Sequence, residues 1–64
     1  MKGDHLKKLR QQIGKSVTEA AAQVHVGERT WLRYEAGEKK IPEGIVELFC
    51  LKNDLPYPPL KAGP

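Results

Sequence analysis

Hydrophobic residues recur at intervals of three and four along most of this chain, which is the spacing of helices with one buried face. The first stripe predicts a helix over residues 5–13, with Asp4 as its N-cap and Gly14 as its stop. Its apolar residues are Leu6, Leu9 and Ile13. Arg10 falls beside this stripe, so we expect its guanidinium to be partly buried and to need a carboxylate, for which Glu35 is the candidate.

Two short helices joined by a tight turn are predicted between Ser16 and Glu35. Ser16 and Glu19 have the spacing of a capping box, in which each side chain accepts a hydrogen bond from the other residue's backbone N–H. In the second helix Trp31 and Tyr34 share an apolar face. The first helix has a narrow stripe of small apolar residues: Ala20, Ala21 and Val24. Such a pair is a helix-turn-helix, a motif whose second helix enters the major groove of DNA.

The turn between these helices lacks its usual glycine. The residue that ends the earlier helix commonly adopts a positive φ, and here it is His25, a residue type that tolerates this conformation better than most. A catalytic or metal-binding histidine would need a neighbouring pattern of Cys, Ser or carboxylates to orient it, and the sequence offers none. We therefore interpret His25 as a turn residue.

A fourth helix is predicted after residues 36–41, a loop in which a glycine ends the preceding helix. Pro42 suits the first turn of this helix, where a missing N–H costs nothing, and Glu43 complements the helix dipole. Its core face runs to about Leu51 and consists of Ile45, Val46, Leu48 and Phe49. Residues 53–64 hold four of the five prolines, so we expect them to run extended over the surface.

The predicted fold class is therefore all-α. Residues 1–52 form a compact four-helix domain whose second and third helices are the helix-turn-helix, and residues 53–64 form a Pro-rich tail. A chain of 64 residues is one small domain and buries only about 60% of its extended surface, so its stability depends on efficient packing or on a partner.

The net charge of +3 and the pI near 9.2 favour a polyanionic partner, but the position of the charge is more informative than its total. Residues 2–15 carry five basic residues against one acidic residue, a net +4, whereas residues 16–35 carry two against three, a net −1. The helix-turn-helix is thus slightly acidic. Attraction to phosphates must come from its flanks, which are the first helix and Lys39 with Lys40.

The composition disfavours several functional classes. A single cysteine rules out an internal disulfide, and one cysteine with two histidines is too few for a tetrahedral structural zinc site. No nucleophile with a base, metal-ligand set or phosphate-binding glycine loop is present, so we expect no enzyme, no cofactor and no small-molecule ligand. No run approaches the roughly 20 apolar residues that span a bilayer, and the N-terminus lacks the apolar core of a signal peptide. We expect a cytoplasmic protein without membrane contact.

Over residues 5–52 the sequence resembles the helix-turn-helix domains of small phage repressors and Cro proteins. The resemblance rests on the alanine at the helix crossing, the apolar residue after the turn, the buried residue of the reading helix and the end of that helix: Ala21, Val26, Trp31 and RYEAGEKKIP. The stretch WLRYEAGEKKIP also resembles short regulators encoded beside anti-CRISPR genes, which repress their own operons as homodimers. Relatives often pair an arginine of the first helix with the glutamate that ends the reading helix, and Arg10 and Glu35 match both positions.

Three positions depart from the family's pattern. His25 stands in place of the turn glycine, Gly27 in place of the Ser or Thr that caps the reading helix, and Val17 in place of a glutamine that contacts phosphate in many relatives. The first two affect the stability of the turn. The third puts one contact to the DNA backbone in doubt.

The resemblance implies that four side chains of the reading helix face base edges: Glu28, Arg29, Leu32 and Arg33. Their chemistry is suitable, because arginine can bond bidentately to guanine O6 and N7, glutamate can accept from cytosine N4, and leucine can contact a thymine methyl. Contacts to phosphate are expected from Lys7, Lys8, Lys15, Ser16, Thr30, Lys39 and Lys40. The alternative for the arginines is a solvated face with ion pairs, such as Arg29 with Glu28 or Arg33 with Glu38.

One reading helix covers only half of an operator, so we expect a homodimer bound to double-stranded DNA at a short inverted repeat. The predicted dimer interface consists of Phe49, Cys50, Leu55, Pro56 and Tyr57. The competing interpretation is that this apolar tail packs on its own core.

The leading functional hypothesis is a sequence-specific transcriptional regulator that represses its own operon. An alternative is an antitoxin-like or adaptor module that uses the same helices and tail to hold a partner protein. RNA binding through the basic first helix is disfavoured, because RNA readers usually display stacking aromatic residues and most of the four aromatics here are assigned to the core.

Overall fold

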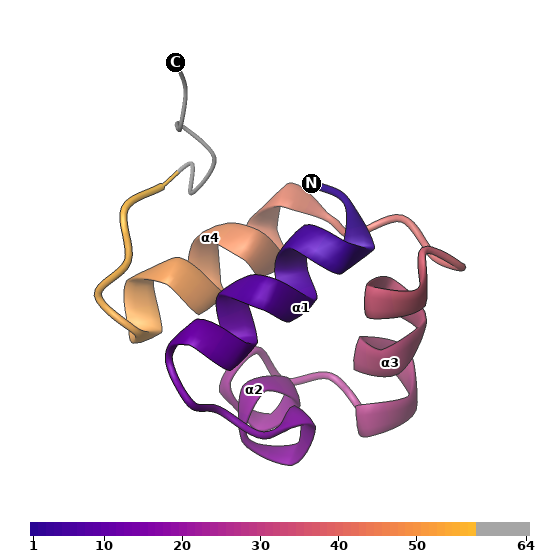
Figure 1. Cartoon of the computed structure of the whole chain (residues 1–64), viewed down its shortest axis with the longest axis horizontal. Helices are drawn as coiled ribbons and strands as arrows, with labels where there is room; N and C mark the ends of the chain where they lie inside the picture. The colour runs from indigo at the N-terminus through magenta and orange to yellow at the C-terminus, as the bar shows by residue number, and fades with distance from the viewer. Residues whose placement is uncertain (58–64) are drawn as a thin grey trace.

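Four α-helices make up most of residues 1–57, the part of the chain that this computed structural model describes (Figure 1). They are α1 (Gly3–Gln12), α2 (Val17–Gln23), α3 (Glu28–Ala36) and α4 (Glu43–Lys52). The predicted all-α class is confirmed, and no strand occurs within residues 1–57. Most of the predicted extended tail, residues 58–64, lies outside the described residues.

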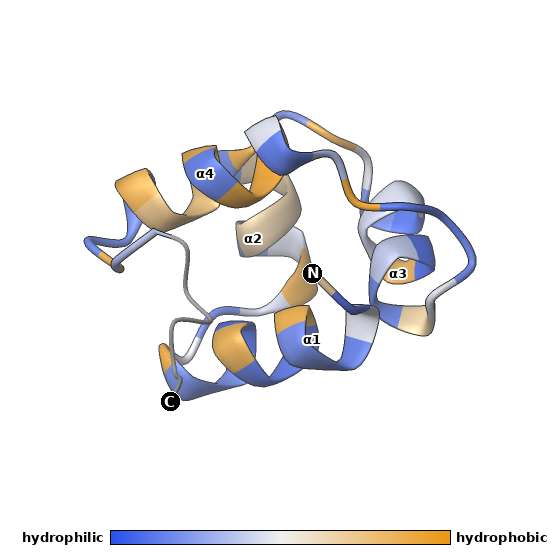
Figure 2. Ribbon diagram, turned by 90° about the horizontal axis from the view of Figure 1, so that it is seen from above, coloured by the Kyte–Doolittle hydropathy of each residue, from blue (hydrophilic) through white to orange (hydrophobic). Residues whose placement is uncertain are grey.

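Helix α3 is in contact with both helices that precede it. It packs against α1 and against α2, while α4 packs against α2 on another side (Figure 1). Figure 2 shows the hydrophobic parts of α1 on the side that faces the other helices and its hydrophilic parts on the outer side. The helices therefore enclose a common core, as the apolar spacing predicts.

The core draws residues from all four helices and from the loop before α4. Trp31 of α3 and Phe49 of α4 are fully buried, and their ring centroids lie 5.3 Å apart at an interplanar angle of 52°. A tilted aromatic contact of this kind is favourable beyond the area that it buries. The remaining buried residues are Leu6, Leu9, Ala20, Ala21, Val24, Tyr34, Ile41, Val46 and Cys50. The prediction that Trp31 and Tyr34 share a buried face is confirmed.

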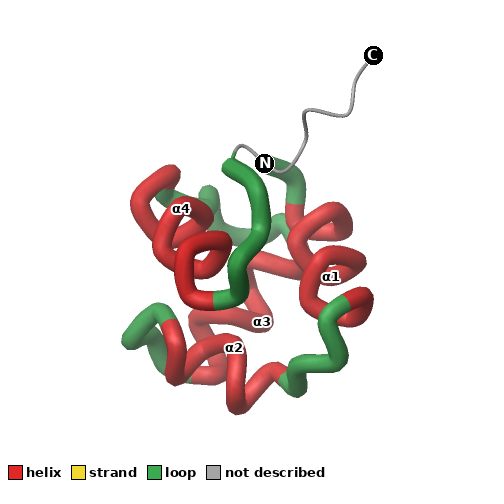
Figure 3. The backbone as a smooth tube through the Cα atoms, turned by 90° about the vertical axis from the view of Figure 1, so that its left-hand side faces the viewer, coloured by secondary structure: helices red, strands yellow, loops and turns green. Residues whose placement is uncertain are grey.

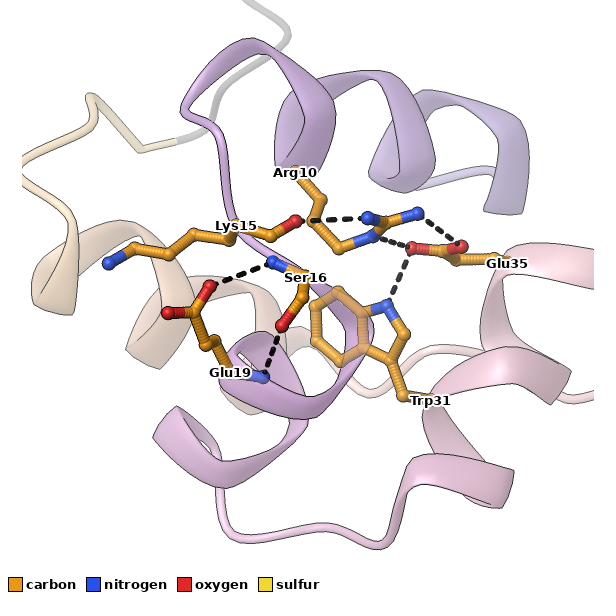
Figure 4. A network of polar contacts seen from close by, with 6 residues as sticks. All are labelled: Arg10, Lys15, Ser16, Glu19, Trp31 and Glu35. Atoms are coloured by element: carbon orange, nitrogen blue, oxygen red, sulfur yellow. Dashed lines mark hydrogen bonds and ion pairs between the residues drawn. The ribbon is translucent and has the colours of Figure 1, made fainter.

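The predicted capping box is present at the start of α2. The backbone N–H of Glu19 donates to Ser16 Oγ at 3.1 Å, and the N–H of Ser16 donates to Glu19 Oε1 at 3.0 Å (Figure 4). The hydrogen bond from the Ser16 N–H is the main cause that lowers the pKa of the Glu19 carboxyl, and the Ser16 hydroxyl and the positive charge of Lys15 lower it further. The carboxylate is therefore ionised at neutral pH and complements the positive end of the helix dipole.

All four helices end in the same type of turn, in which two backbone N–H groups donate to carbonyls of the last helical turn. One residue of each turn has a positive φ; it is the C-cap in α3 and the residue after the C-cap in the other three helices. In α2 this residue is His25, with φ of 59°; its N–H donates to the carbonyl of Ala22, and the N–H of Val26 donates to that of Ala21. Glycine occupies the equivalent place after α1 and α3, and aspartate after α4: Gly14, Gly37 and Asp54. The predicted conformation of His25 is confirmed, and the glycine stops are where the sequence places them.

The starts of α1 and α4 differ from the prediction. Helix α1 begins at Gly3 and has Lys2 as its N-cap, so Asp4 lies in the first turn instead of capping the helix. A Cβ at Gly3 would lie 2.3 Å from the carbonyl oxygen of Tyr34, so the first turn of α1 can approach the end of α3 only because this residue is glycine. Pro42 is the N-cap of α4, one position before the first helical residue.

The far end of α4 is tied back to α2. The side-chain amide of Asn53 donates to the Phe49 carbonyl at 2.8 Å and to Gln23 Oε1 at 2.9 Å, and Gln23 donates to Asn53 Oδ1 at 3.3 Å. The next residues turn back from the end of α4 (Figure 3), and Leu55 packs against the core. The hydroxyl of Tyr57 donates to the Glu43 carboxylate at 3.1 Å. This first part of the tail therefore packs on its own domain.

One carboxylate joins α1 to α3 (Figure 4). Glu35 Oε2 accepts from Arg10 Nε at 2.6 Å and from Trp31 Nε1 at 2.6 Å, while Glu35 Oε1 accepts from Arg10 Nη2 at 3.2 Å. Arg10 Nη1 donates to the Lys15 carbonyl at 3.0 Å, which adds the α1–α2 loop to the network. The side chains of Arg10 and Glu35 are only 12% and 7% exposed. The ion pair that the sequence indicated is thus bidentate and largely buried, and the sequence did not indicate the Trp31 donor.

We expect the substitution His25→Gly to stabilise the protein. His25 is exposed, so glycine removes the strain of a positive φ without losing packing, a gain of about 0.5 to 1 kcal/mol or about 2 to 8 °C in melting temperature. Ala22→Gly, at an exposed position inside α2, is the matched control and should lower stability by about 0.5 to 1 kcal/mol. Thermal melts followed by circular dichroism measure both. Equal losses in the two variants would contradict strain at His25.

We expect Glu35→Ala to destabilise the protein by about 3 to 5 kcal/mol, because it leaves the buried guanidinium of Arg10 and the indole N–H of Trp31 without their acceptor. Glu35→Gln, which keeps an acceptor but loses the charge, should cost less. The control is Glu38→Ala, which removes an exposed carboxylate near the same end of α3 and should change stability by less than about 0.5 kcal/mol. Urea titration gives the three values. A loss in Glu35→Ala as small as that of the control would show that the network contributes nothing.

Candidate nucleic-acid interface

The outer face of α3 carries the four residues that the sequence predicted to read bases. Glu28, Arg29, Leu32 and Arg33 are all exposed, while Trp31 and Tyr34 hold the opposite side of the helix in the core. At about 100° per residue, Arg29, Leu32 and Arg33 fall within an arc of about 100°. The fold therefore presents these three side chains together, on a helix whose rotation about its axis is set by its buried face.

A shallow hollow of about 300 Å³ lies on this face. It is lined by Arg29, Leu32, Arg33, Ala36 and Glu38. Glu28 does not line it and stands apart at the start of α3. Sequence reasoning missed Ala36 and Glu38. The signal for Ala36 was available, because it follows Leu32 by four residues and so lies on the same side of the helix, whereas Glu38 comes after the turn at Gly37 and its position depends on that turn.

The two arginines of the hollow are free to bind a ligand. Among residues 1–57 neither Arg29 nor Arg33 forms an ion pair or a side-chain hydrogen bond, so the expected alternatives, Arg29 with Glu28 and Arg33 with Glu38, do not form in this structure. Leu32 is 52% exposed beside them on the same face of α3. Two forked donors and an apolar contact are the groups that distinguish base pairs in the major groove.

The residues predicted to contact phosphate are distributed around α3. Lys39 and Lys40 line a second hollow, of about 460 Å³, together with Lys2, which the sequence analysis did not select. Gly37 and Ile41 also line it, so the positive charge lies directly beside the end of α3. These lysines are exposed, and their flexible side chains can reach the phosphate groups of a polyanion.

The remaining basic candidates lie on or after α1. Lys7 and Lys8 are exposed on α1 itself. Lys15 is half-buried; its carbonyl holds Arg10, and its side chain extends away from Glu35 (Figure 4). Its ammonium group is therefore separated from the Arg10–Glu35 pair and could contact a phosphate near the start of α2.

The start of α2 offers less to a phosphate than the prediction supposed. The backbone N–H of Ser16 is used by Glu19, and Ser16 Oγ accepts from the N–H of Glu19, which leaves its hydroxyl hydrogen as the donor. The ionised Glu19 beside it repels phosphate. Thr30, the other hydroxyl candidate, is half-exposed in the first turn of α3.

The predicted dimer interface divides into two parts. Phe49 and Cys50 are fully buried in the protein's own core. Side chains that fill the core cannot contact a second subunit, so the prediction is wrong for these two residues. Burial also raises the pKa of the Cys50 thiol, which keeps it protonated and unreactive. Leu55 is half-buried, and Pro56 and Tyr57 are exposed.

The exposed apolar residues at this end of the molecule include one that the sequence analysis did not select. Leu51 is 69% exposed near the end of α4, and Tyr57 is 40% exposed. Partial desolvation and the hydrogen bond to Glu43 raise the pKa of the Tyr57 hydroxyl, which therefore remains protonated and donates. Leu51 near the end of α4 and Tyr57, whose hydroxyl reaches back to the start of α4, are thus two exposed apolar side chains in this part of the chain.

Among residues 1–57 no three His, Cys, Asp or Glu side chains are grouped so that they could hold a metal ion. No helix in this range has the length and apolar character needed to cross a membrane.

Comparison with known proteins gives one family. Searches of curated proteins and of solved structures give no match. A model of the helix-turn-helix domain matches residues 3–51, which include all of α1, α2 and α3 and nearly all of α4. The match covers more than three quarters of the chain and contains the hollow on α3 and the carboxylate that joins α3 to α1. The chain therefore belongs to the helix-turn-helix domain family, a family of DNA-binding proteins.

Proposed function

We propose that this protein is a homodimeric transcriptional repressor of phage or mobile-element type, which binds an inverted repeat upstream of its own operon. The observation that carries the proposal is the outer face of α3, where Arg29 and Arg33, which have no ion-pair partner among residues 1–57, line a shallow hollow with an exposed leucine. Membership of the helix-turn-helix family supports DNA binding. The size of the described domain supports a dimer, because one reading helix contacts only half of a typical operator.

The charges support a division of labour between affinity and discrimination. The reading face has little net charge, because Glu28 and Glu38 oppose Arg29 and Arg33. Attraction to the DNA backbone must therefore come from the lysines around it, chiefly Lys39 and Lys40 with Lys7 and Lys8. These contacts are independent of sequence and weaken as salt rises.

The orientation of the reading helix also supports specific binding. A bidentate contact to guanine is directional, so the helix must not rotate or tilt relative to the rest of the domain. Glu35 holds α3 to α1 through Arg10, and the indole of Trp31 fixes the same carboxylate from within α3. A reading helix held in this way suits recognition of base edges better than nonspecific attraction to phosphate.

The exposed apolar residues after and near the end of α4 support the proposal of a dimer. Leu51, Pro56 and Tyr57 expose apolar surface on a domain too small to leave it uncovered without a cost in solubility. A two-fold axis at this surface would relate two copies of α3, and binding to an inverted repeat requires half-sites about one turn of DNA apart or a multiple of it.

The proposal predicts a protected inverted repeat in the DNA directly upstream of the gene or operon that encodes the protein. Footprinting with purified protein at about 150 mM salt should show protection of two half-sites whose centres are about 10 base pairs apart or a multiple of that distance. A scrambled duplex of the same composition is the control. If no repeat is protected there and specific binding occurs elsewhere, the protein is a regulator but does not repress its own operon.

The proposal also predicts a dimer in solution that depends on the end of α4. Sedimentation should give twice the mass of the chain for the wild type and a shift to monomer for Leu51→Arg and for Tyr57→Ala, because the first places a charge at the interface and the second removes an aromatic contact. Glu38→Arg, an exposed change beside α3, is the control and should stay dimeric. A monomeric wild type would overturn the homodimer, and dimeric variants would move the interface away from this surface.

A further inference from the structure

The hollow of about 460 Å³ beside the end of α3 gathers three lysines from two segments that are distant in the chain (Figure 1). Lys2 precedes α1, whereas Lys39 and Lys40 lie in the loop that follows α3. All three are exposed, and none of them has an ion-pair partner among residues 1–57. In the same range no aspartate or glutamate lines the hollow. This lysine hollow therefore concentrates positive charge that is open to an anion.

The lysine hollow depends on a close approach of α1 to α3. A Cβ at Gly3 would overlap the carbonyl oxygens of Tyr34 and Glu35, so a larger residue would hold the start of α1 away from the end of α3. Gly3 and Tyr34 both line the hollow. The contact between these two helix ends is what brings Lys2 to the lysines of the loop.

The positive charge of the lysine hollow comes from side chains and not from a helix end. At the contact the N-terminal end of α1 meets the C-terminal end of α3, and the partial charges of these two ends have opposite signs and offset each other. The carbonyl of Tyr34 accepts from the N–H of Gly37 at 3.2 Å, so it is already satisfied. An anion in this hollow is therefore held by three long, flexible ammonium side chains, which suit an extended polyanion better than a small isolated ion.

The lysine hollow adjoins the surface that faces DNA under the proposed function. Ala36 and Glu38 line the hollow on the outer face of α3. Gly37 and Lys39, which alternate with them in the chain, line the lysine hollow. A duplex that holds α3 in its major groove must carry a sugar-phosphate strand past an end of that helix, since the strands border the groove. The lysine hollow is placed to receive such a strand.

We propose that the lysine hollow holds the sugar-phosphate backbone of the DNA beside each half-site, with Lys2 bound at the same phosphate groups as Lys39 and Lys40. This inference rests on the proposed function, because it assumes that α3 enters the major groove. It adds Lys2 to the interface and makes the start of α1 part of the surface that grips the backbone.

The salt dependence of binding tests the charge of Lys2. A duplex that the wild-type protein enriches from a random pool is compared with a scrambled duplex between about 50 and 200 mM salt. The slope of log affinity against log salt should be less steep in Lys2→Ala by about 0.9 for each bound subunit, on both duplexes alike. Lys2→Arg, which keeps the charge, should keep the wild-type slope. Lys52→Ala, an exposed change at the end of α4, is the matched control and should also keep it.

Two outcomes of this experiment have different consequences. If Lys2→Ala keeps the wild-type slope on a duplex that the wild type binds specifically, the inference is wrong and the proposed function stands. If the wild-type protein enriches no duplex at all, the proposed sequence-specific function is itself wrong.

Neutral phosphates locate the contact. A methylphosphonate removes the charge of one phosphate at a time, and the position at which wild-type binding weakens marks a contact. Lys2→Ala and Lys40→Ala should lose their sensitivity at the same position of each half-site. Lys7→Ala, an exposed change elsewhere on α1, should keep that sensitivity. Loss at different positions in Lys2→Ala and Lys40→Ala would show that these lysines do not share a site on the DNA, which contradicts the proposal.

Folding and binding of a free anion are measured separately. Lys2 precedes α1 without a side-chain hydrogen bond to it, so Lys2→Ala should have the circular dichroism spectrum of the wild type. Calorimetric titration of the free protein with pyrophosphate should show no saturable site that depends on Lys2. A site of that kind, together with an unchanged salt slope in Lys2→Ala, would assign the lysine hollow to a free phosphorylated ligand and overturn the proposal.

Discussion

The carboxylate of Glu35 is the group on which the arrangement of this domain most depends. It accepts hydrogen bonds from Arg10 of α1 and from Trp31 of α3, and it lies in a region where an unpaired charge would be strongly unfavourable. Because Arg10 also binds the carbonyl of Lys15, the same guanidinium orients the loop that leads into α2. The angle between α3 and the rest of the domain is thereby fixed by directional bonds as well as by packing.

The short helices are stabilised largely at their ends. Helix α2 has only seven residues, too few to be stable alone, yet it begins with a capping box and ends with a hydrogen-bonded turn at His25. The same turn closes α1, α3 and α4, and in two of the four cases a residue other than glycine adopts the positive φ. A small domain with a limited core gains much of its stability from satisfying backbone groups in this way.

The surface separates the groups suited to discrimination from those suited to attraction. The face of α3 combines two arginines with an exposed leucine and has carboxylates at both ends, whereas most of the lysines among residues 1–57 lie on or beside α1 and in the loop after α3. Carboxylates near the arginines repel phosphate, and under the proposed function this repulsion would limit nonspecific binding. Lysine, with a flexible stem and a compact charge, is better suited to the uniform DNA backbone.

The sequence by itself determined the features that depend on near neighbours in the chain. The periodicity of apolar residues predicted four helices and the burial of Trp31 and Tyr34, and three-residue spacing predicted the capping box, because these interactions join residues within one turn. Only the tertiary structure decided that Cys50 is a core residue, that Gly3 must be small to meet α3, and which residues complete the hollow with Arg29. An apolar stripe shows that a face is buried but not what covers it, since that depends on how segments distant in the chain pack together.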